Sequence, residues 1–172
     1  SSVSAEKFTG YIDLTDCIFD VYDDEEEAAS SFWIDISNDA WFEMQRGKGN
    51  QQPITDDVYI DPINGNNDWS GTSPDSAFQT ILRAQQLIYP TVDNQINIYL
   101  AQGTYSPNSN GETFPIRLRS YTNLIGDEQT GAENIILDSD GFGGNEVMWF
   151  GQNKTNRLEN LTVTGGRDEV CC

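Results

Sequence analysis

The chain has 172 residues, of which 9 are Lys or Arg and 28 are Asp or Glu, so its net charge is −19. This excess of negative charge argues against nucleic acids and anionic membranes as partners, because like charges repel. The absence of histidine removes most zinc chemistry and the commonest general base. No stretch approaches the roughly 20 apolar residues of a membrane span. We therefore expect one folded domain or two small ones, with no membrane span.

Residues 1–45 are predicted to form a small antiparallel β region. Aromatic and β-branched residues indicate strands at 17–22, 31–36 and 40–45. The acidic run at 23–27 is typical of a solvated loop. Three such strands can shelter one apolar face, so we expect a small sheet that packs on the rest of the chain rather than standing alone.

Residues 46–57 contain few apolar side chains and several Gly and Pro, which predicts a linker. A short strand at 58–60 follows, and the Gly- and Asn-rich segment 61–72 is typical of a loop. Ser76 can cap a helix that runs to about residue 89, before Pro90. The predicted apolar stripe of this helix consists of Phe78, Ile81, Leu82 and Ile88, and is interrupted by Gln85.

After residue 96 the pattern changes to short apolar strands separated by turns. Strands are predicted at 96–100, 116–118, 122–125, 134–137, 147–150 and 158–164. Most are closed or closely followed by Gly. Short strands at nearly regular spacing indicate a solenoid, whose successive turns bury their side chains in a narrow interior.

Several motifs follow one another between residues 58 and 166. The first are Val58-Tyr59-Ile60-Asp61-Pro62, Asn64-Gly65-Asn66, Gly71-Thr72-Ser73 and Ala77-Phe78-Gln79-Thr80-Ile81 with Ala84. The later ones are Ile98-Tyr99-Leu100-Ala101-Gln102-Gly103-Thr104-Tyr105, Asn123-Leu124-Ile125-Gly126 and Leu158-Glu159-Asn160-Leu161-Thr162-Val163-Thr164-Gly165-Gly166. In this order they resemble the opening segment of secreted pectate-lyase-like proteins, at a position held there by a family of unknown function.

The resemblance implies that residues 58–172 form the capped beginning of a right-handed parallel β-helix. The open end of such a coil exposes backbone groups and an apolar interior, and the amphipathic helix at 76–89 is suited to cover it. The predicted fold is thus mostly β: a small antiparallel region, a linker and a capped β-helix start. This scaffold carries lyases, hydrolases, epimerases and inert surface proteins, so it does not define an activity.

No group of residues predicts a catalytic site. Asp138 and Asp140 are two apart and could share one face of a strand, but Asp-Ser-Asp-Gly is also ordinary turn chemistry, which we favour. A lyase mechanism needs acids that hold Ca²⁺ and a basic residue that removes a proton. The basic residues of the coil region are Arg117, Arg119, Lys154 and Arg157. None lies beside an acidic cluster, and we expect solvated salt bridges for each.

A calcium site is the one metal site that the composition favours. Asp61, Asn64, Asn66 and Asp68 supply oxygen ligands around Gly65, although the full EF-hand pattern is absent. The alternative is a loop held by bonds from its own side chains to its backbone. Asn160 likewise has two interpretations: the Asn-Leu-Thr triplet fits a glycosylation acceptor, and an inward amide would bond along stacked turns of the coil.

The chain carries three cysteines, Cys17, Cys171 and Cys172. Its small, polar opening residues are typical of a mature end left by signal cleavage, and we expect a secreted or cell-surface protein. Outside the cell three thiols do not all stay free. We expect one of the adjacent pair to bond to Cys17 or to another chain, with the pairing left open.

Two functional hypotheses remain. The first is a non-enzymatic extracellular structural or adhesive protein that assembles head to tail into a homo-oligomer or polymer, with Ca²⁺ or salt screening its charge. The second is the N-terminal part of a secreted polysaccharide lyase or another carbohydrate-active enzyme, which makes a polysaccharide the partner.

Overall fold

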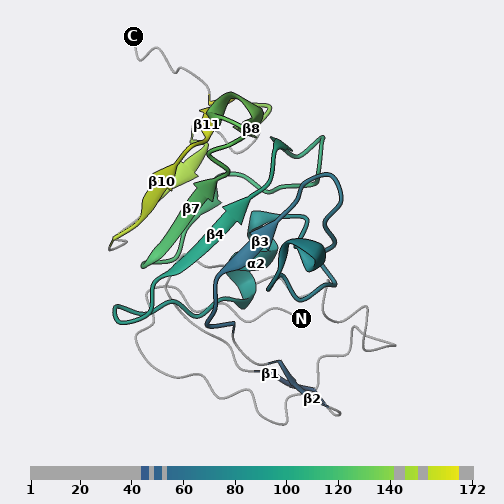
Figure 1. Ribbon diagram of the computed structural model, residues 1–172, viewed down its shortest axis with the longest axis vertical. Helices are drawn as coiled ribbons and strands as arrows, with labels where there is room; N and C mark the ends of the chain where they lie inside the picture. The colour runs from purple at the N-terminus through teal and green to yellow at the C-terminus, as the bar shows by residue number, and fades with distance from the viewer. Residues whose placement is uncertain (1–43, 47–48, 52–53, 142–145, 151–154, 167–172) are drawn as a thin grey trace.

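The computed structural model describes residues 44–46, 49–51, 54–141, 146–150 and 155–166 (Figure 1). Within these ranges the chain is mostly β, with a single α-helix and two short 3-10 helices. Strand β1 (Met44–Arg46) pairs antiparallel with β2 (Gly49–Gln51), and every other strand pairing is parallel. The predicted strands at 17–22 and 31–36 and all three cysteines lie outside the described residues.

Three parallel sheets make up the body of the molecule. The largest has the order β10-β7-β4-β3, with strands Arg157–Glu159, Thr122–Gly126, Ile96–Leu100 and Val58–Ile60. The second has the order β11-β8-β5, with strands Thr162–Thr164, Ile135–Asp138 and Gly103–Tyr105. The third pairs β6 with β9, which are Ile116–Arg117 and Met148–Trp149.

The chain visits these sheets in the same order on each pass. It runs through β4, β5 and β6, then β7, β8 and β9, then β10 and β11, and each pass pairs with the one before it. Figure 1 shows the strands of the largest sheet side by side. This repeated parallel stacking is the arrangement that short strands at regular spacing predicted.

The core lies between the sheets, and β3, β4 and β8 contribute alternate residues to it. Strand β4 alternates buried and half-buried side chains, so Ile98 points inward while Asn97 and Tyr99 point outward. The parallel register stacks Ile98 between Val58 of β3 and Leu124 of β7, and all three are fully buried. Burying such columns is the main force that holds the passes together.

The free edge of the first strand, β3, is covered by the loop that follows it. The N–H of Tyr59 donates to Gly71 O at 2.8 Å, and the N–H of Phe78 donates to Tyr59 O at 2.9 Å. Gly71 has a φ of +70°, and a Cβ there would lie 2.0 Å from the Phe78 ring, so only glycine fits. The loop thereby satisfies backbone groups that would otherwise form an open sheet edge.

The α-helix is shorter than predicted. It spans α2 (Ile81–Leu87), is capped by Thr80 rather than Ser76, and follows a 3-10 helix, Pro74–Ser76. Phe78 lies outside it, because its backbone forms a parallel bridge with Ile60 of β3 instead of a helical turn. Ile81 and Ile88 are buried as expected, whereas Leu82 is only half-buried.

Two buried charged residues hold this helix, Glu112 from the segment before β6 and Arg119 from the segment after it. The carboxyl group of Glu112 accepts the N–H of Ile81 at 2.6 Å and that of Leu82 at 3.1 Å, so its oxygens satisfy two backbone donors at the start of the helix. Near the other end, Arg119 Nε donates to Gln85 O at 2.8 Å. The expected solvated role of Arg119 was wrong, since helix α2 presents its carbonyl to the guanidinium away from solvent.

Candidate functional site

The outer surface of the largest sheet carries two columns of side chains, which we call the outer face. It consists of the outward residues Asp57, Tyr59, Asn97, Tyr99, Asn123, Ile125, Arg157 and Glu159. Strand alternation turns them outward, and the parallel register aligns them from strand to strand. The chain thus brings together residues up to about a hundred positions apart.

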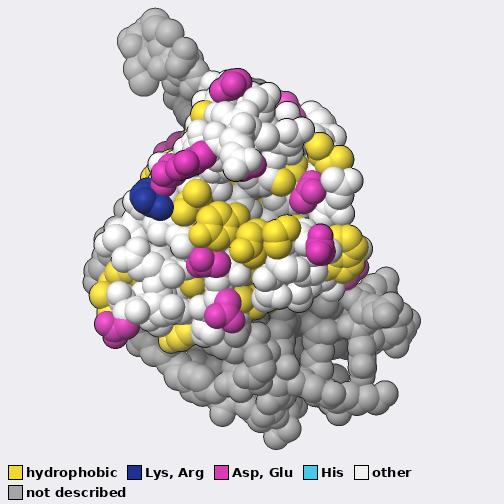
Figure 2. All heavy atoms as spheres, in the orientation of Figure 1, with side chains coloured by type: hydrophobic (Ala, Val, Ile, Leu, Met, Phe, Trp, Pro, Cys, Tyr) yellow, Lys and Arg dark blue, Asp and Glu magenta, His cyan; other side chains and the backbone are white. Residues whose placement is uncertain are grey.

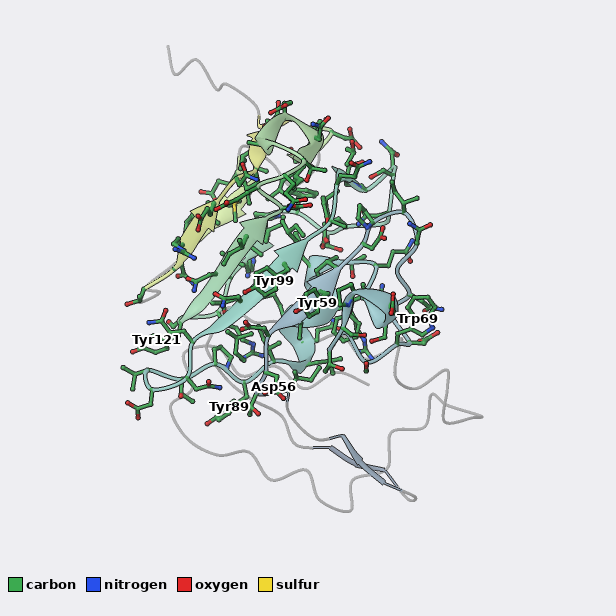
Figure 3. All side chains as sticks on the ribbon, in the orientation of Figure 1. Asp56, Tyr59, Trp69, Tyr89, Tyr99 and Tyr121 are labelled. Atoms are coloured by element: carbon green, nitrogen blue, oxygen red, sulfur yellow. The ribbon has the colours of Figure 1, made fainter. Side chains whose placement is uncertain are left out.

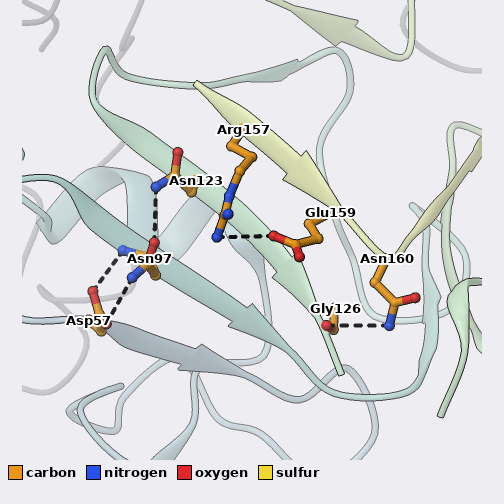
Figure 4. A network of polar contacts seen from close by, with 7 residues as sticks. All are labelled: Asp57, Asn97, Asn123, Gly126, Arg157, Glu159 and Asn160. Carbon is orange, nitrogen blue, oxygen red and sulfur yellow. Dashed lines mark hydrogen bonds and ion pairs between the residues drawn. The ribbon is translucent and has the colours of Figure 1, made fainter. Parts of the chain in front are cut away.

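The first column is a hydrogen-bonded ladder (Figure 4). The Asp57 carboxylate accepts the backbone N–H of Asn97 at 2.7 Å and the Asn97 side-chain amide at 3.1 Å. The Asn97 amide oxygen in turn accepts from Asn123 Nδ2 at 2.9 Å. Three neighbouring chain segments are therefore joined by side chains, and their polar groups are held in fixed orientations.

The second column is aromatic. The rings of Tyr59 and Tyr99 stack with centroids 5.3 Å apart and planes 24° apart. Both side chains are half-buried, and Ile125 follows Tyr99 in register on β7. Burial raises the pKa of Tyr99 above its ordinary value, and the neighbouring Asp57 carboxylate adds to this, so the phenol keeps its proton at neutral pH.

Ile125, Tyr99 and Tyr59 form an apolar strip that crosses the sheet from β7 to β3. Figure 2 shows it as a band of hydrophobic side chains flanked by acidic ones, and Figure 3 labels Tyr99 and Tyr59 within it and Trp69 beyond. Trp69 lies in the loop after β3 and is 45% exposed. Aromatic side chains with polar tips that are partly exposed at a protein surface are typical of recognition surfaces.

An ion pair lies at the β10 end of the outer face. Arg157 Nη2 and Glu159 Oε2 are 3.0 Å apart, although the angle between them is not that of a hydrogen bond. The Arg157 side chain is 60% exposed and the Glu159 side chain 36% exposed, so solvent screens the pair and it adds little to stability. It does neutralise the acidic side chain at this end of the face.

The residues predicted to bind calcium form bonds within their own loop. The Asp61 carboxylate accepts the backbone N–H groups of Ile63 at 2.8 Å and Asn64 at 2.9 Å. The Asn66 side-chain oxygen accepts the N–H of Asp68 at 2.9 Å. Burial raises the pKa of Asp61, but the bonds from Asn64 and Ile63 outweigh it and lower the pKa overall. Calcium binding stays a prediction, which calorimetric titration with Ca²⁺ tests.

Two other candidates have structural roles. Asp138 accepts the N–H of Asp140 at 2.9 Å, and Asp140 has a φ of 51°, which confirms the turn. Asn160 donates its side-chain amide to Asp127 O at 2.6 Å, which confirms the bond between stacked passes of the chain. That amide is already engaged, so the glycosylation interpretation loses support.

The outer face was not predicted as a site, although a sequence signal for it exists. A polar residue, an aliphatic residue and a further apolar or aromatic residue recur as Asp57-Val58-Tyr59, Asn97-Ile98-Tyr99 and Asn123-Leu124-Ile125. The repeat indicates aligned outward columns once the strands are known to stack in parallel.

These features define a class: a mostly β protein of stacked parallel sheets with an aromatic and amide surface on one of them. The chain belongs to the family described as "Protein of unknown function (DUF1565)", whose model matches residues 63–169. No curated protein and no solved structure matches the chain. Among the described residues, no helix has both the length and the apolar character needed to cross a membrane.

Proposed function

We propose that this chain is the capped beginning of a right-handed parallel β-helix in a non-enzymatic extracellular protein of adhesive kind. The observation that carries the proposal is the outer face, where stacked tyrosines lie beside a hydrogen-bonded ladder. Right-handedness rests on the general preference of parallel crossover connections and on the resemblance to pectate-lyase-like proteins.

The outer face suits adhesion because it is organised before any partner arrives. Asn97 is held by three hydrogen bonds from its backbone and side chain, so little side-chain freedom is lost on binding. Tyr59 and Tyr99 hold each other by stacking. Aromatic rings supply most of the contact energy in surfaces of this kind.

Extracellular placement and head-to-tail assembly belong to the same proposal. The net charge of −19 favours solubility in a crowded exterior. Leu158 and Val163 are 38% and 43% exposed, although they align in register with the fully buried Leu124 and Leu137. These two exposed side chains suit pairing with further β-strands, supplied either by later residues of the same protein or by a second copy.

Retention on polysaccharides tests the adhesive role against the lyase alternative. The 172-residue chain is passed over beads carrying neutral and anionic extracellular polysaccharides, and the eluate is assayed for new reducing ends and unsaturated sugar products. We expect retention without product. Product formation would establish the enzymatic alternative, and free passage over every matrix would contradict adhesion to polysaccharide.

A further inference from the structure

Resting on the proposed adhesive function, we propose that the outer face binds a neutral polysaccharide chain. The sugar chain lies across the strands, over Tyr99 and Tyr59 and toward Trp69. This assigns both the ligand class and the direction in which the ligand runs.

The apolar strip fits the flat faces of sugar rings. Aromatic rings carry negative charge on their faces, so they attract the weakly positive C–H groups that line one face of a pyranose. The strip runs from β7 to β3, and Trp69 lies beyond its β3 end, past an acidic side chain, so the aromatic side chains span a length that suits a polymer rather than a single sugar (Figures 2 and 3). A polymer that spans the strip contacts several rings at once.

The polar column fits the hydroxyl groups of the same ligand. It lies directly beside the tyrosines, because Asp57 and Tyr59 are two apart, as are Asn97 and Tyr99. Phenol hydroxyls both donate and accept hydrogen bonds, and sugar hydroxyls do the same. One edge of the sugar chain therefore meets polar groups while its flat face meets the rings.

The charges of the outer face select a neutral ligand. Acidic side chains flank the strip, and the net charge of the chain is −19, so a polyanion is repelled (Figure 2). The carboxylates within the face already have partners: Asp57 bonds twice to Asn97, and Glu159 pairs with Arg157. A cationic partner would have to displace these bonds, whereas a neutral sugar leaves them in place.

Isothermal titration of the full chain with cellohexaose, mannohexaose and xylohexaose tests this inference. We expect at least one neutral probe to bind, and Tyr99→Ala to weaken it at least tenfold. Tyr99→Phe keeps the ring and stays within about threefold of the parent chain, since a face-on contact needs the ring more than the hydroxyl. Tyr89→Ala is the matched control, because Tyr89 is a 42% exposed tyrosine that lies away from the strip (Figure 3).

Trp69→Ala keeps the test decisive if Tyr99→Ala does not fold, because Trp69 is exposed and its loss leaves the core intact. We expect it to weaken binding at least threefold. Equal affinity of the parent, Tyr99→Ala and Trp69→Ala chains for a neutral probe would overturn the site. Binding of polygalacturonate or of chitosan oligomers alone would overturn the ligand class while leaving adhesion in place. Retention of the parent chain on no polysaccharide would overturn both proposals.

Discussion

Glu112 is the residue whose burial is hardest to reconcile with its charge. It lies entirely inside the molecule, where ionisation is costly, yet it accepts N–H groups from Ile81, Leu82 and Thr113. Burial raises its pKa to about 7, while those hydrogen bonds limit the rise. Glu112 is therefore a cap for helix α2 that changes its charge near neutral pH.

This pKa predicts a pH dependence of stability. The folded chain holds the Glu112 proton more tightly than the unfolded chain, whose pKa stays near 4.5. The resulting stabilisation is complete below about pH 4.5 and is lost as the pH rises through about 7. Glu112→Gln resembles the protonated form, so from pH 4.5 to 7 it gains up to about 3 kcal/mol relative to the parent chain. Urea unfolding across this range measures the difference.

Glu133 provides the control, because its side chain is exposed whereas that of Glu112 is buried. Glu133→Gln is measured over the same pH range as a control for the removal of one exposed negative charge. If Glu112→Gln keeps a constant difference from the parent chain, then Glu112 has an ordinary pKa and its carboxylate is not held as described.

Helix α2 is the element that holds the first pass of the chain. It buries Ile81, Ala84 and Leu87 and contacts β3 and β6. It has only two turns, too few to be stable alone, so it depends on its packing and on the bonds from Glu112 and Arg119. Its position beside β3, the first strand of the sheet, agrees with the covering role expected of an amphipathic helix.

Replacing Ile81 with Asp tests that role. Ile81 is fully buried, and an unpaired carboxylate there meets the Glu112 charge, so we expect a loss of about 3 kcal/mol or more in unfolding free energy. Val92→Asp adds the same charge at a position that is 64% exposed, and changes stability by less than about 0.5 kcal/mol. Thermal melts compare the two variants, and an Ile81→Asp chain as stable as its parent would refute the covering role.

The strands were predictable from sequence, and the bounds of the helix were not. In Ile96-Asn97-Ile98-Tyr99-Leu100 every second residue is aliphatic, and this pattern lies within five consecutive residues. It therefore identifies both the strand and its outward residues from the sequence alone. Whether Phe78 joins the helix depends on its bridge to Ile60, a contact between segments that no local pattern contains. The outer face could not be predicted from local sequence for the same reason. The bond from Asn97 to Asp57 joins residues 40 apart, and the register depends on the turns between them.

The whole molecule is a stack with one covered end and one exposed end within the described residues. The loop after β3 satisfies the edge of the first strand, whereas β10 and β11 lie at the far edges of their sheets, as far as the described part extends. Leu158 and Val163 continue interior columns at those edges. The negative charge opposes contact between copies until salt screens it.

We therefore expect self-association that increases with ionic strength or Ca²⁺. Sedimentation velocity of the full chain from low to high salt measures it, and a Leu158→Asp variant, changed at the exposed column, associates less than the parent. Leu158 is already partly exposed, so this variant keeps its fold. A single monomeric species in every condition would contradict the assembly proposal without affecting the outer face.

The proposed binding of a neutral polysaccharide to the outer face of the β3-β4-β7-β10 sheet makes a prediction for individual residues. Amide chemical shifts of the full chain, recorded by NMR during titration with the neutral hexasaccharide that binds best, test it most directly. We predict that the largest shifts fall on residues 57–59, 97–99 and 123–125, with smaller ones around Trp69. Shifts confined to the β5-β8-β11 sheet, or no shifts at saturating sugar, would contradict the account.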